Sequence, residues 1–215
     1  MGKKLDATVM NQQLVKLATG TTLAYCSSQP ANYAGIAAMT LMAQTGLTCP
    51  APNGGVNGTS GSFTFAAGTT ANANGEVGRK ATIAAATGIA AAATGVATHV
   101  ALHDGTTMLA VQHVGAVTQT GTAQAGAAST ITLAAGATAT DDIYNGYGVR
   151  ITSGPGAGQD RIISDYVGST KVATVSSAWT VQPTSASVYE VFGMAMTSGA
   201  SYNPGAVVYE LNQPA

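Results

Sequence analysis

The chain has 215 residues, of which 46% are hydrophobic. Only 8% are charged, against about 25% in an average soluble domain. A net charge of −1 excludes strong attraction to nucleic acid, and no apolar run reaches the ~18 residues that a membrane span needs. A surface with so few charges suits a protein that is packed in an assembly. A secreted bacterial protein with a low-charge surface is the alternative.

The N-terminal region predicts one short helix and then a strand. Residues 7–18 place apolar side chains at helical spacing, between a good N-cap at Asp6 and a stop at Gly20. Residues 21–27 alternate as a strand does. Alanine and methionine favour a helix over 34–47, whereas glycine and threonine oppose it, and an extended segment is the preferred interpretation.

Residues 48–78 are rich in Gly, Asn, Ser, Thr and Pro, which predicts a long surface loop or arm holding one strand. Phe63 and Phe65 form its one apolar patch. Such a loop cannot bury two rings against itself, so we expect them to make inter-subunit contacts on a neighbouring copy.

Beyond this segment the alternation of apolar residues predicts strands over 79–85, 88–93, 96–103 and 106–114. Asp104-Gly105 between the last two predicts a hairpin with a two-residue type I′ turn. That turn would pair 102 with 107, 100 with 109 and 98 with 111.

On that pairing the three histidines cannot share a metal ion. His99 and His103 lie on one face roughly 13 Å apart at ~3.3 Å per residue, and His113 points to the other face. Metal ligands must lie within ~2.0–2.3 Å of one ion, so we expect no metal and no cofactor.

No other residues form a catalytic or binding pattern. Cys26 and Cys49 are not at a metal-ligand spacing; free thiols are the default, and a disulfide between them is the alternative. The glycine-rich 154–158 joins two strands and is not a phosphate loop. Asp141 and Asp142 are expected to be solvated turn residues rather than cation ligands.

The stretch from 121 to 192 predicts a small antiparallel barrel or sandwich. β-Branched and aromatic residues recur two apart, separated by glycine- and proline-containing turns. The spaced residues are Ile131 and Leu133, Val149 and Ile151, Ile162, Ser164 and Tyr166, Ala173 and Val175, and Tyr189 and Val191. Trp179, the single tryptophan, is expected to fill much of its core.

The same stretch resembles a module found in fibre, baseplate and head proteins of tailed bacteriophages. The matching residues are Tyr144, Gly146, 151–154, 156–159, Arg161, Ile163, Asp165, Tyr166, 171–175, 178–180 and 187–190. The resemblance covers about a third of the chain, and that family supplies no catalytic motif.

A second resemblance, carried by 24–30, 78–83, 93–102, 104–105, 196–199 and 206–211, is to a family of small tailed-phage structural proteins. In that family the strand after the Asp-Gly turn leads directly to the final hairpin. The resemblance therefore implies two small antiparallel β-sandwich or barrel domains. Residues 1–114 plus 194–215 form the first, and 116–192 form the second, inserted into it.

These resemblances imply a structural component of a tailed-phage virion without catalytic activity, foremost a capsid decoration or head-associated protein. The implied partners are further copies of the chain, as a homotrimer, and the major capsid or other virion proteins. The first residues lack the apolar core of a secretion signal, so we expect synthesis in the host cytoplasm. A tail or neck fibre component that contacts the host surface is the alternative, and a glycan depolymerase is the third hypothesis.

Overall fold

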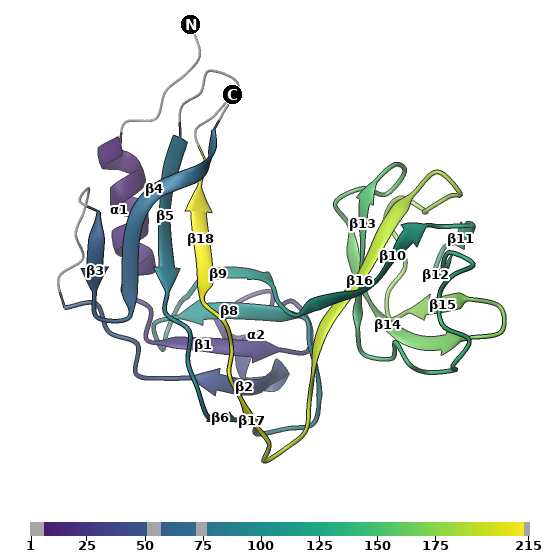
Figure 1. Ribbon diagram of the computed structural model, residues 1–215, viewed down its shortest axis with the longest axis horizontal. Helices are drawn as coiled ribbons and strands as arrows, with labels where there is room; N and C mark the ends of the chain where they lie inside the picture. Colours follow the sequence, from purple (N-terminus) through teal and green to yellow (C-terminus); the bar gives the residue numbers. More distant parts are fainter. Residues whose placement is uncertain (1–6, 51–56, 72–76, 213–215) are drawn as a thin grey trace, which may run out of the picture.

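The computed structural model describes residues 7–50, 57–71 and 77–212, and Figure 1 shows them arranged in two lobes. The protein is mostly β with antiparallel sheets and a short N-terminal helix, which confirms the predicted fold class. The predicted N-cap, Asp6, lies outside the described residues.

The elements are as follows, in chain order: α1 Ala7–Leu17, β1 Thr22–Cys26, α2 Tyr33–Met39, β2 Thr40–Gln44, β3 Gly58–Ser60, β4 Phe63–Ala71, β5 Val77–Ile83, β6 Ile89–Ala90, β7 Gly95–Ala97, β8 His99–His103, β9 Met108–His113, β10 Ala116–Thr122, β11 Ala125–Ala127, β12 Thr130–Thr132, β13 Gly148–Ser153, β14 Asp160–Val167, β15 Val172–Val175, β16 Val188–Met196, β17 Ser201–Tyr202 and β18 Val207–Leu211.

The first unit combines two four-stranded sheets. Their strand orders are β2-β1-β8-β9 and β18-β5-β4-β3, and α1 packs against β5 (Figure 1). Apolar side chains from α1 and both sheets meet in one core, among them Leu14, Tyr25, Phe63, Ile83 and Leu102. Burial of this shared core is what holds the two sheets together.

The expectation of an extended segment over 34–47 was wrong in its first half. Tyr33–Met39 is helical, and the strand begins only at Thr40. The Asn32 side chain caps the helix by accepting from the backbone N of Gly35, and the Thr40 hydroxyl donates to the Ile36 carbonyl at the other end. Because these two side chains satisfy the helix ends, the glycine and threonine that argued against a helix are tolerated.

The strand expected within 48–78 is present as part of β4, but the interpretation of this segment as a surface loop or arm was wrong. Within its described residues β3 and β4 form a hairpin, and β4 pairs with β5 in the register Phe63 to Ile83 and Phe65 to Ala81. Phe63 is 0% and Phe65 2% exposed, so neither ring is available to a neighbouring subunit. The Phe-Thr-Phe alternation was a core strand pattern hidden in a composition typical of loops.

The second unit follows the prediction closely. Its strands lie in the order β10-β16-β13-β14-β15-β12-β11, and β12 to β16 include the spaced pairs that the sequence singled out, except that Leu133 lies just beyond the end of β12. Trp179, 6% exposed, belongs to their common core. Residues 154–158 lie in the connection from β13 to β14, as expected.

One detail of this unit differs from the prediction. The register of β14 against β15 shifts between Ile163 and Asp165. This bulge brings Ile163 rather than Ile162 onto the buried face together with Tyr166. An extra residue in one strand reverses the alternation on its far side, and sequence periodicity alone does not reveal it.

The two units meet where the chain passes between them. β16 pairs with β10 and β13 up to Gly193 and then with β7 from Met194 onward, so one strand serves both lobes (Figure 1). Gly115 stands beside Gly193, with φ of 98°, and a Cβ there would lie 2.1 Å from the Gly193 carbonyl carbon. The buried apolar residues form separate clusters on the two sides.

Candidate functional site

The hairpin of β8 and β9 sets the positions of the histidines, and its predicted register was wrong. Leu102 pairs with Ala110 rather than with Thr107, a shift of three residues. A shift by an odd number exchanges the faces of one strand relative to the other. His99 therefore stands directly opposite His113, on the same face of the sheet.

The Asp104 side chain is the cause of the shift. Its Oδ1 accepts from the backbone N of Thr106 at 3.0 Å and of Thr107 at 2.7 Å. Gly105 alone in this turn has a positive φ, whereas a type I′ turn needs two such residues. The loop is accordingly longer than two residues, and a bulge lies between Leu102 and His103.

The inserted unit adds a carboxylate to the histidine pair. Asp160, the first residue of β14, places its Oδ2 3.6 Å from the Nε2 of His99 and 3.6 Å from the Nε2 of His113. The three ligand atoms lie within 4.8 Å of one another. The prediction that His99 and His113 lie on opposite faces was therefore wrong. Among the described residues, His99, His113 and Asp160 form the group that could hold a metal ion.

The hydrogen of His99 can be assigned from its neighbours. The Thr98 hydroxyl donates its one hydrogen to the Ser27 carbonyl at 2.8 Å, so it can only accept from the His99 Nδ1 at 3.0 Å. Nδ1 therefore carries the hydrogen, and Nε2 presents a lone pair to Asp160. The His99 side chain is 2% exposed, and this Nε2 has no hydrogen-bond partner.

His113 is held in the opposite tautomer. An arginine can only donate, so the His113 Nδ1 accepts from the Arg150 Nη1 at 3.0 Å and the neutral ring carries its hydrogen on Nε2. Arg150 also forms an ion pair with Glu190 and lies 5.5 Å from the centre of the Phe192 ring. His99, His113, Arg150 and Glu190 thus form one connected polar cluster with Asp160.

Charge at this site follows from burial. Desolvation by burial, helped by electrostatic interaction with His113 and Arg150 and opposed by Asp160, lowers the pKa of His99 to about 4. The Nε2–H of His113 facing it lowers the pKa of Asp160 below its ordinary value, against the effect of burial. At neutral pH the site therefore combines a neutral His99 with an ionised Asp160.

Solvent reaches the site through a hollow of about 250 Å³. Its wall includes His99 and Asp160 together with Ser28, Gln29 and Ser176. His113 borders a second hollow on the side of β18.

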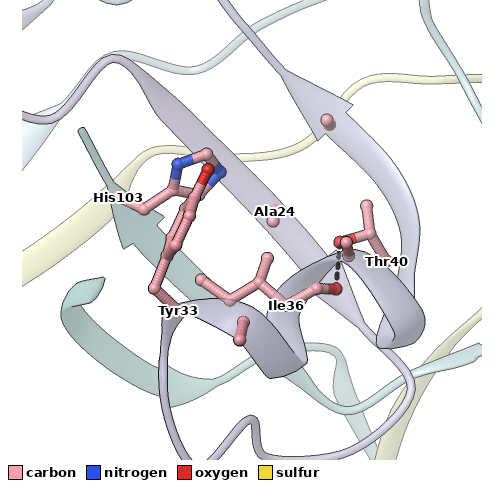
Figure 2. A pocket seen from close by; sticks show the side chains of 8 residues that line it. Ala24, Tyr33, Ile36, Thr40 and His103 are labelled. Carbon is pink, nitrogen blue, oxygen red and sulfur yellow. Dashed lines mark hydrogen bonds between the residues drawn. The ribbon is translucent and has the colours of Figure 1, made fainter. Parts of the chain in front are cut away.

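A further hollow of about 290 Å³ lies between α2 and β1 (Figure 2). Tyr33 stands edge-on to His103 at its rim, with ring centres 5.3 Å apart, and alanines, Ile36 and Thr40 form the rest of the wall. The Thr40 hydroxyl is already bonded to the Ile36 carbonyl. The described wall is mostly apolar and contains no Asp or Glu.

The remaining sequence candidates have structural roles. Cys26 and Cys49 are free thiols, and burial raises the pKa of Cys26, which makes it a poor nucleophile. Asp141 accepts from the Gly168 backbone N, and Asp142 accepts from the Asn145 side chain. Both are turn residues, as expected.

Searches against protein families, curated proteins and solved structures find no match for this chain. Among the described residues no helix has the length and apolar character needed to cross a membrane.

Proposed function

We propose that the protein is a non-enzymatic structural component of a tailed-phage virion, most specifically a capsid decoration or head-associated protein. The observation that carries this proposal is the chemistry of the sheet edges. From Thr106 to Thr140 the sequence contains no Asp, Glu, Lys or Arg.

Three strands that lie at the edges of sheets fall within this uncharged run. β9 ends the sheet that starts with β2, while β10 and β11 are the two ends of the strand order in the second unit. Monomeric proteins usually protect such edges with charged side chains, because an open edge pairs readily with another chain. β10 is largely exposed, and Val117 in it is 47% exposed. These edges favour a protein that pairs with neighbours.

Assembly also agrees with the low overall charge. At 8% charged residues, the surface offers little repulsion between copies. We propose that other copies, as a homotrimer, and the major capsid protein or another virion protein cover the exposed edges. Phe63 and Phe65, buried in their own chain, take no part in this assembly.

A tail or neck fibre component is the alternative, favoured by one observation. The second unit projects as a separate lobe beside the first unit (Figure 1). A lobe placed in this way could reach a host surface while the first unit stays attached to the particle. A glycan depolymerase has less support, because Tyr33 is the one aromatic residue among the described large exposed hydrophobics.

Gold labelling of purified particles of the phage that encodes the chain tests the proposal. An antibody to the protein should label intact virions over the head. Label on the neck or tail would favour the fibre alternative. Absence of the protein from purified virions would refute both, and glycan cleavage by the pure protein would refute its non-enzymatic character.

A further inference from the structure

We propose that His99, His113 and Asp160 bind one divalent transition-metal ion, such as Zn²⁺, and that this ion fastens the inserted unit to the first unit. Two ligands come from the β8–β9 hairpin and the third from β14, so the ion would bridge the two lobes. The inference is independent of where the protein acts.

The spacing of the ligand atoms fits a metal better than a direct hydrogen bond. Ligands at 2.0–2.1 Å in a tetrahedron lie about 3.4 Å apart. The Asp160 Oδ2 stands 3.6 Å from each Nε2, too far for a good hydrogen bond and close to this value. The three ligand atoms all lie within 4.8 Å of one another, so the widest pair must approach by about 1.4 Å for tetrahedral coordination.

The electronic arrangement of His99 supports the same inference. Its Nε2 lone pair faces a carboxylate with no hydrogen between them, and two acceptors at this distance repel. A buried polar atom without a partner is costly, and a cation between the two would satisfy both. The Nδ1–H held by Thr98 is the bond that typically orients a metal-binding imidazole.

Binding of the ion is opposed by a rearrangement that it requires at His113. To coordinate through Nε2, the ring must move its hydrogen to Nδ1, and Arg150 can then no longer donate to that atom. Arg150 keeps its ion pair with Glu190, which partly neutralises its charge. The positive charge of Arg150 therefore weakens binding of the ion moderately. Removing this charge should strengthen binding, and that response would distinguish this site from others.

The hollow beside His99 leaves room for the rest of the coordination sphere. Water can approach Asp160 from the side of Ser28, Gln29 and Ser176. Three protein ligands with one open position is a common zinc arrangement.

The test is calorimetric titration of ZnCl₂ into the full chain after removal of metal with EDTA. The expected result is one ion per chain. Thr98 orients a ligand, so Thr98→Val should weaken binding by the ~10–100-fold typical of such residues. Asp160→Asn and His113→Gln remove a ligand itself and should weaken binding by more than this. Arg150→Met should bind more tightly than the parent. His103→Gln, on the same strand outside the site, is the matched control and should bind normally.

Thermal unfolding of each metal-free variant establishes that it is folded. Zn²⁺ should then raise the Tm of the parent and of His103→Gln but not that of Asp160→Asn. Failure of the parent to bind Zn²⁺ would overturn the proposal. Equal binding by the parent and Asp160→Asn would also overturn it, because the ion would then be held elsewhere.

Discussion

Acidification should weaken the protein through His99 before it affects any buried carboxylate. The ordinary pKa of a histidine is 6.5, and in the folded protein burial lowers that of His99 to about 4. Between these two pKa values, His99 is protonated in the unfolded chain and neutral in the folded chain. The stability linked to His99 is therefore complete above pH 6.5 and is lost as the pH falls towards 4.

The size of the effect follows from the two pKa values. With 1.36 kcal/mol per pKa unit, the free energy of unfolding should fall by about 2.5 kcal/mol between pH 7 and pH 4.5. His99 is 2% exposed, so solvent screening does not reduce this figure much. The pKa of Asp160 is lowered, so its own contribution is lost only below pH 3.8 and does not confound the comparison.

Urea unfolding at several pH values, in EDTA, measures the effect in the parent and in His99→Gln. The glutamine cannot bind a proton, so its stability should change about 2.5 kcal/mol less than that of the parent over this range. Parallel pH profiles for the two proteins would contradict this prediction, since they would mean that His99 titrates alike in the folded and unfolded chains.

Three further predictions concern the two units. Trp179→Ala should cost ~3–5 kcal/mol in urea unfolding of the second unit, because the ring is 6% exposed, and should leave the first unit folded by circular dichroism. Replacing 115–193 by a short turn should leave a folded, soluble first unit; an unfolded product would contradict the insertion. Gly115→Ala should cost ~1–3 kcal/mol because of its φ of 98° and the contact with Gly193, whereas Gly136→Ala, which meets nothing within 4 Å, should be nearly neutral.

The parts of the fold that sequence could predict are those governed by local pattern. Val149 and Ile151 sit two apart between clear turn residues, and α1 has helical spacing, so both were placed correctly. The strand through Phe63 and Phe65 was predicted, but the burial of both rings was not, because the surrounding composition is typical of a surface loop. Both rings are buried because β4 pairs with β3 on one side and with β5 on the other, and composition does not reveal these pairings.

The histidine site could not be found from local pattern for two reasons. The Asp104 side chain lengthens the hairpin loop, and a shift of three residues moved His113 to the other face from the one expected. Asp160 then joins the site from the inserted unit, through a contact that depends on how two units pack. A hairpin prediction that weighed the Asp104 side chain against the Asp-Gly turn signal could have paired His99 with His113.

Incorporation of edge variants into virions is the decisive measurement of whether the protein assembles through the β10 edge. A phage lacking the chain would be supplied with the parent, Val117→Lys or Val181→Lys, and copies per purified particle would be measured by quantitative mass spectrometry. Val117 lies on the uncharged edge strand β10, while Val181, 53% exposed, lies outside the strands and serves as the control. A lysine on β10 should reduce incorporation about tenfold or more, as a penalty of ~1.4 kcal/mol implies, and Val181→Lys should match the parent. Equal incorporation of all three would contradict assembly through the β10 edge, and absence of the parent itself from particles would contradict the virion proposal.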